Sequence, residues 1–160
     1  MKKLLTLLIL VISSTVLYAQ EKTPVKLLIG EDLNSVTVYF QELMNIVKKR
    51  NVVLKEEVTS SGDLQLVFHA SNGDKLINCQ IITLVFKRIN KIEYCQKQTI
   101  TGFSDASANV NLKYLKDNFE HMERNTYFKE IEKNKKGIEA NYHVEPHGFA
   151  IIYNLLENNN

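Results

Sequence analysis

Three residues near the C-terminus have the types and spacing of a metal site. His143, Glu145 and His147 stand at every second position, and alternate residues of a β-strand project from the same face. Neutral imidazole and carboxylate groups suit zinc and other divalent ions. Pro146 and Gly148 instead favour a turn before His147, which would separate its side chain from the other two. The sequence therefore leaves two interpretations, a metal site and a polar turn.

The two cysteines could form a disulfide. Cys79 and Cys95 lie on neighbouring predicted strands, and paired cysteines are common in oxidising compartments. A turn near residues 88–90 would place Cys95 opposite Thr83, four residues from Cys79. Because a disulfide needs Cα atoms within about 7 Å, that offset requires a bulge. A Cys79–Cys95 disulfide and two separate thiols both remain open.

The common catalytic and nucleotide-binding motifs are missing. The sequence has no G-x-S-x-G elbow, no H-E-x-x-H pair, no P-loop and no G-x-G-x-x-G loop, each of which places a nucleophile, a metal or a phosphate. We therefore predict no cofactor.

The first 19 residues have the layout of a secretory signal peptide. A short basic start precedes an apolar run over residues 4–12, and Ala19 supplies the small residue that signal peptidase needs. The run is shorter than the ~20 residues that span a bilayer, which favours cleavage between Ala19 and Gln20 over an uncleaved anchor. No later stretch predicts a membrane span. We expect the protein to be exported, and to be periplasmic or extracellular.

Charge argues against polyanionic partners. The chain of 160 residues has 20 Lys and Arg against 18 Asp and Glu. Two of the bases, Lys2 and Lys3, lie in the signal segment, which holds no acid, so 18 residues of each sign remain after cleavage. A neutral domain predicts no strong attraction to nucleic acid or to an anionic membrane.

The sequence predicts a single domain over residues 31–157, preceded by a tether or short strand at 20–30 and followed by a frayed tail at 158–160. Hydrophobic spacing predicts two helices in this domain. The first helix runs from about residue 34, capped by Asn34 or Ser35, to about residue 50. The second runs to about residue 124, capped by Asp105 or Ser107. Their apolar stripes are Val36, Tyr39, Phe40, Leu43 and Val47 in the first, and Val110, Tyr114, Leu115, Phe119 and Met122 in the second.

Seven strands are predicted between turn signals. The Asn72–Gly73 dipeptide is typical of a two-residue type I′ turn, which would pair Phe68 with Ile77. Short turns make neighbouring strands antiparallel. The expected fold is α+β, a mainly antiparallel sheet with two amphipathic helices on one face in the order α-β4-α-β3. The strands cover residues 52–59, 64–69, 76–88, 91–101, 126–133, 138–144 and 149–156.

Two functions follow from these features. The first is a small, exported, non-catalytic binding protein that holds a protein or a small apolar ligand on the open sheet face or between sheet and helices. Aromatic residues in nearly every predicted element favour it, although most of them are expected in the core. The alternative is a small α+β enzyme with a pocket, in which His69, His121 or a carboxylate acts as general base. The oligomeric state is not predicted.

Cleavage at the predicted site is directly measurable. When the full chain is expressed with an intact export pathway, we expect the mass and the N-terminal sequence of the exported protein to begin at Gln20. Replacing Ala19 by arginine should leave the precursor uncleaved, because the peptidase pocket accepts only small residues. An exported protein that retains Lys2 and Lys3 would contradict the prediction.

Overall fold

The computed structural model describes residues 24–46, 52–70, 81–133 and 135–157. The predicted signal peptide, the Asn72–Gly73 turn, Cys79 and the C-terminal tail lie outside these ranges. Within the described ranges, no helix has both the length and the apolar character needed to cross a bilayer.

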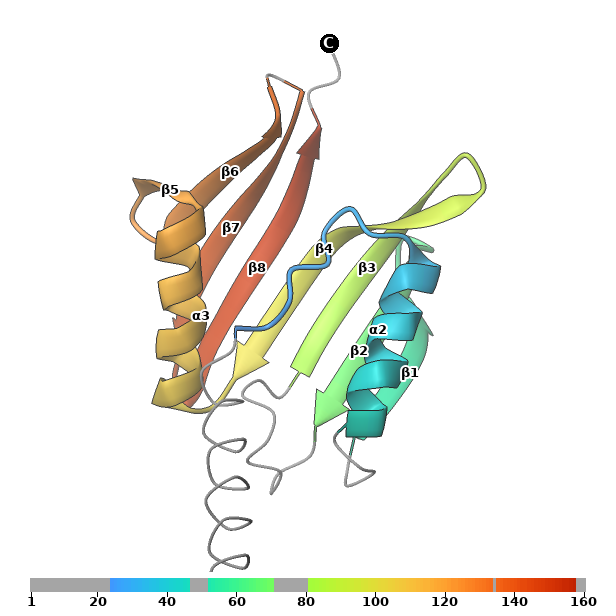
Figure 1. Ribbon diagram of the computed structural model, residues 1–160, viewed down its shortest axis with the longest axis horizontal. Helices are drawn as coiled ribbons and strands as arrows, with labels where there is room; N and C mark the ends of the chain where they lie inside the picture. The colour runs from blue at the N-terminus through green and yellow to red at the C-terminus, as the bar shows by residue number, and fades with distance from the viewer. Residues whose placement is uncertain (1–23, 47–51, 71–80, 134, 158–160) are drawn as a thin grey trace, which may run out of the picture.

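Two helices and eight strands make up the described fold (Figure 1). All strands pair antiparallel in one sheet, in the spatial order β1-β2-β3-β4-β8-β7-β6-β5. The expected antiparallel α+β class is confirmed, but each helix is followed by four strands, so the order α-β4-α-β3 is wrong. The helices are α2 (Leu33–Ile46) and α3 (Asp105–Asn118); the strands are β1 (Val52–Val58), β2 (Leu64–Ala70), β3 (Ile81–Ile89), β4 (Ile92–Gly102), β5 (Glu120–Glu123), β6 (Thr126–Glu132), β7 (Lys136–Glu145) and β8 (Gly148–Glu157).

The additional strand, β5, takes the place of the last predicted turn of the second helix. The helix ends because Phe119 adopts an extended backbone with φ −130° and ψ 146°, while its N–H still bonds to Leu115 O. The chain then reverses at Arg124, whose φ is 49°, and β5 pairs with β6. Met122, expected in the buried helical stripe, lies on β5 and is 58% exposed.

Both helices begin at caps that differ from those predicted. Asp32 caps α2 in place of Asn34 or Ser35, since its carboxylate accepts hydrogen bonds from the backbone N–H and the hydroxyl of Ser35 at 3.0 and 2.7 Å. These bonds favour the ionised form and lower the pKa of Asp32. In α3 the cap is Ser104, one residue before the predicted Asp105.

The pairing of β2 with β3 differs from the predicted hairpin. Phe68 pairs with Ile82, five residues beyond the expected Ile77. A shift by an odd number of residues exchanges the two faces of a strand. As a result Ile82 and Leu84 are buried toward the helices, while Ile81 lies on the other side of the sheet.

The hairpin of β3 and β4 contains the type I′ turn. Asn90 and Lys91 have φ values of 51° and 71°, which matches the two positive values that this turn requires. The turn and a bulge in β4 set the register. Cys95 therefore lies opposite Phe86, and the predicted position opposite Thr83 is wrong.

The hydrophobic core lies between the sheet and the two helices, which cover the same side of it (Figure 1). Phe40 of α2 stacks on Phe68 of β2 at 4.8 Å between ring centroids. Under α3, Phe119 packs against Tyr153 of β8 at 6.0 Å. The buried core residues are Leu28, Val36, Phe40, Leu66, Phe68, Ile82, Leu84, Phe86, Cys95, Ile100, Leu115, Phe119, Tyr127, Ile138, Ala140, Phe149, Ile151 and Tyr153.

The segment 24–30, which we call the strap, lies between the helices and crosses β4 and β8 (blue in Figure 1). Gln98 of β4 holds it, although Gln98 itself is 0% exposed. Its amide oxygen accepts from the Leu28 N–H at 2.7 Å, and its amide nitrogen donates to Lys26 O at 2.9 Å. Asn111 of α3 adds a bond from the Val25 N–H at 3.0 Å. The described part of the predicted tether is therefore packed into the domain.

The strap also completes the edge of β4 where β8 leaves it. The pairing of β4 with β8 runs from Lys97 to Gly102. Nearer the start of β4, Gly30 N–H bonds to Cys95 O at 2.8 Å and Cys95 N–H bonds to Glu31 O at 2.9 Å. Backbone groups that β8 does not reach are thus satisfied by the N-terminal segment.

Replacing Gln98 by alanine should destabilise the domain strongly. The change leaves the Leu28 N–H and the Lys26 carbonyl without their partner in a buried seam, so we expect the free energy of unfolding to fall by about 2–4 kcal/mol. Urea denaturation followed by far-UV circular dichroism measures this loss. The exposed Gln41 of α2 is the matched control, and Gln41→Ala should stay within about 0.5 kcal/mol of the parent. Equal losses for the two variants would contradict the role of Gln98.

Candidate functional site

The side of the sheet opposite the helices, which we call the open face, is the candidate site. Paired residues on neighbouring strands project to the same side, so the register places each side chain. One row crosses six strands through the pairs Val67–Thr83, Thr83–Thr99, Thr99–Ile152, Ile152–Asn141 and Asn141–Thr126. The next row consists of Ile81, Thr101, Ala150 and His143.

These two rows form a band of β-branched, small and amide side chains with one imidazole, His143. They contain no Lys, Arg, Asp or Glu. Nearly all of their members are half-buried, since neighbouring side chains shield one another on a continuous sheet. The band passes without a break through the central pair β4 and β8, so both halves of the sheet contribute to one surface.

Outside the band, the two halves of the open face carry opposite charges. The half formed by β1–β4 presents Lys55, Lys87 and Lys97 against Glu57. The half formed by β5–β8 presents five glutamates in register: Glu120, Glu123, Glu130, Glu139 and Glu145. Lys135 and Lys136, at the end of this half, are paired with Glu132 and Glu157. The surface is therefore bipolar although the mature chain is predicted to be neutral.

Phe128 of β6 is the large aromatic side chain in the acidic half, and Gly137 of β7 makes room for it. A Cβ atom at Gly137 would lie 2.5 Å from the Phe128 ring, closer than atoms that are not bonded can approach. The ring therefore lies over the backbone of β7. Glycine within a strand often marks such a close approach.

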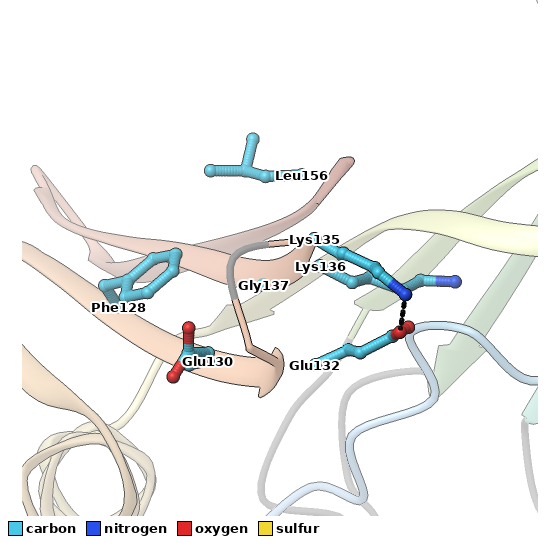
Figure 2. Close-up of a pocket in the computed structure, with 7 residues that line it drawn as sticks. All are labelled: Phe128, Glu130, Glu132, Lys135, Lys136, Gly137 and Leu156. Atoms are coloured by element: carbon cyan, nitrogen blue, oxygen red, sulfur yellow. Dashed lines mark hydrogen bonds and ion pairs between the residues drawn. The ribbon is translucent and has the colours of Figure 1, made fainter. Parts of the chain in front are cut away.

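A hollow of about 250 Å³ lies on one side of this ring, and we call it the Leu156 hollow. Figure 2 shows Phe128 and Glu130 extending from β6, with Leu156 of β8 across the hollow. Its two lysines are engaged: Lys135 binds Glu132 at 2.9 Å and Lys136 binds Glu157 at 3.2 Å. The lining thus combines two apolar walls with charges that largely balance.

A second hollow of about 410 Å³ lies against the same phenylalanine, and we call it the Met122 hollow. Its lining consists of Met122, Glu123, Thr126, Phe128 and Glu139. Two carboxylates and no base face this space, between a thioether and an aromatic ring.

A chain of hydrogen bonds fixes Glu139 in the Met122 hollow. The Thr126 hydroxyl donates to Asn141 Oδ1 at 2.9 Å, and Asn141 Nδ2 donates to Glu139 Oε1 at 2.9 Å. The carboxylate is therefore held in place before any ligand arrives.

All three residues of the predicted metal site lie within the described part of the structure. His143 and Glu145 lie on the open face of β7, and His147 lies in the turn that follows. All three are exposed. Among the residues that the structure describes, no group of three or more His, Cys, Asp or Glu is arranged to hold a metal ion. The turn before β8 separates His147 from the other two.

The histidines considered as general bases are also exposed and scattered. His69 lies on β2 and His121 on β5. The ring of His121 packs against Tyr127 at 5.1 Å, and its Nε2 is 2.8 Å from Arg124 O. Neither residue lines the Leu156 hollow or the Met122 hollow.

Comparison of the chain with protein-family models, curated proteins and solved structures found no match. The open face must therefore be interpreted from its own geometry.

Cys95 is buried on the helix side, away from the open face. Its Sγ lies 3.5 Å from Lys97 O. Burial disfavours the thiolate and raises the pKa of the Cys95 thiol to about 12. Cys79 lies outside the described residues, so the Cys79–Cys95 disulfide stays a prediction.

Thiol counting separates the two hypotheses for the cysteines. In a Cys79→Ser variant, Cys95 should react with Ellman's reagent at pH 8 at least 100-fold more slowly in the native protein than in guanidinium, because the buried thiol stays protonated. The unreduced parent, assayed in guanidinium, should show either no thiol if the disulfide forms or two if it does not. Rapid native labelling of Cys95 would contradict the buried, protonated thiol.

Proposed function

We propose that the protein is an exported, non-catalytic binding protein that holds a protein partner on its open face. The observation that carries the proposal is the band of the open face, which extends across strands of both halves and is not covered by either helix. A helix stripe or a sheet face that is not needed for the core is available for intermolecular contact.

The composition of the open face favours a protein partner over a small apolar ligand. Interfaces between proteins combine a low-charge centre with a charged rim, which matches the band and the flanking lysines and glutamates. Each hollow described on this face also includes charged residues in its lining. A small apolar ligand is better held in an enclosed apolar cavity.

The size of the surface also suits a protein. Eight strands spaced about 4.8 Å apart give a width of roughly 38 Å, and strands of this length give roughly 20–30 Å in the other direction. The resulting area is comparable to the ~800 Å² that each partner contributes to a standard interface.

An enzymatic function has less support from the arrangement of the side chains. A general base needs a concave site in which it faces a substrate. His69, His121, His143 and His147 are all exposed and come from different parts of the chain. The arrangement of the side chains therefore favours binding over catalysis.

Export is part of the proposal and rests on the predicted signal peptide.

Site-specific photocrosslinking tests the binding face. A benzoylphenylalanine at the position of Thr99, in the centre of the band, should give a discrete covalent adduct with another protein in the envelope of cells that export the chain. The same probe at Val38, which is 52% exposed on α2, should give none. A second change in the band, Ile152→Lys, should reduce the Thr99 adduct at least tenfold, because a buried unpaired charge opposes docking.

Three results would overturn the proposed function. The first is the absence of an adduct from Thr99, and the second is equal labelling from Thr99 and Val38. The third is an adduct that mass spectrometry identifies as a second copy of this chain instead of a different protein.

A further inference from the structure

The acidic half of the open face contains two hollows that share one aromatic wall, Phe128. We propose that this pair of hollows binds an extended peptide segment of the partner, with an arginine or lysine in the Met122 hollow and an apolar side chain in the Leu156 hollow. The inference rests on the proposed function and specifies the chemistry of the partner.

The Met122 hollow suits a basic side chain with a long apolar stem. Lysine and arginine bury their methylene groups along apolar surface while the charged head stays near polar groups. Met122 and Phe128 supply the apolar surface, and the face of an aromatic ring also attracts a cation. Glu123 and Glu139 supply opposite charge, and no basic residue lines this hollow.

The Leu156 hollow differs because its charges largely balance. Lys135 and Lys136 are held by Glu132 and Glu157, so an incoming cation would compete with lysines that are already in place. What this hollow offers is apolar surface from Phe128 and from Leu156, which is 41% exposed. An apolar side chain of the partner gains most there.

The walls are fixed in advance of binding. The lack of a Cβ at Gly137 leaves room for the Phe128 ring over the backbone of β7. The hydrogen bonds from Thr126 to Asn141 and from Asn141 to Glu139 hold the Glu139 carboxylate. Preorganised contacts bind more tightly because less conformational freedom is lost on association.

An extended segment matches two hollows on either side of one ring. In a β-conformation, residues at i and i+2 project to the same side about 6.6–6.8 Å apart. This spacing is similar to the distance between two side chains that contact opposite sides of one aromatic ring. The basic residue is directed to the β5–β8 half by charge, since Lys55, Lys87 and Lys97 repel it from the other half.

A peptide titration tests the proposal. The probe is an amidated peptide, Gly-Ser-Arg-Thr-Leu-Ser-Gly, with carboxyfluorescein coupled to its N-terminal amine. The mature chain is titrated in 20 mM salt with fluorescence anisotropy as the readout. Saturable binding is expected. The peptide in which citrulline replaces arginine keeps the shape but loses the charge, and its affinity should be at least about tenfold lower.

Variants locate the peptide on the surface. Glu139→Gln should weaken binding of the arginine peptide about tenfold and leave the citrulline peptide unchanged, because only the charged head interacts with this carboxylate. Glu42→Gln, at an exposed position on α2, is the matched control and should change neither affinity. Circular dichroism verifies that each variant is folded.

Four results would overturn the inference. The first is no binding of the arginine peptide up to about 1 mM, and the second is equal affinity for the citrulline peptide. The third is an equal effect of Glu139→Gln and Glu42→Gln on affinity. The fourth is sedimentation of the chain as a dimer that does not bind the peptide. If Thr99 still gives its protein adduct in the first three cases, the proposed function stands and only the chemistry assigned to the partner fails.

Discussion

A single buried amide determines how the two halves of the molecule are joined on the helix side. Gln98 lies at the centre of the sheet, on the strand β4 that pairs with β8. Both the oxygen and the nitrogen of its side-chain amide form hydrogen bonds with the strap. A leucine at this position would fill the space but leave a backbone N–H and a carbonyl without partners. The position of the strap is therefore specified by hydrogen bonding as well as by packing, and Leu28 of the strap completes the core between the two helices.

The helices and the strap cover one face of the sheet, which explains why the candidate site lies on the other face. The helices and the strap bury large apolar residues of β2, β3, β4, β6, β7 and β8 on one face, so the open face is left with side chains of intermediate polarity. The central pair β4 and β8 makes that face continuous, and the unequal distribution of lysine and glutamate between the halves makes it bipolar. Net charge conceals this arrangement, because opposite charges on two ends of one surface cancel in a sum.

The sequence predicted the elements better than their register. Helical spacing and turn residues located both helices and most strands, but the run from Ile81 to Phe86 is apolar on both faces, so hydrophobicity alone could not decide which residues of β3 face the core. β5 has four residues and no alternating pattern, and only its pairing with β6 identifies it. The hollows at Phe128 were missed because strand register brings their residues together. Gly137 was predicted in the turn before residues 138–144, so its place inside β7, where a glycine can mark a close approach, was not recognised from the sequence.

The strand order also determines how the sheet ends. Because β4 and β8 protect one another, the described part of the sheet ends at the edges of β1 and β5. An exposed strand edge can recruit further chains and lead to aggregation. β1 contains the sequence Lys55-Glu56-Glu57, and β5 is four residues long with a glutamate at each end. Charge and short length at these two edges therefore oppose uncontrolled growth of the sheet by strand addition.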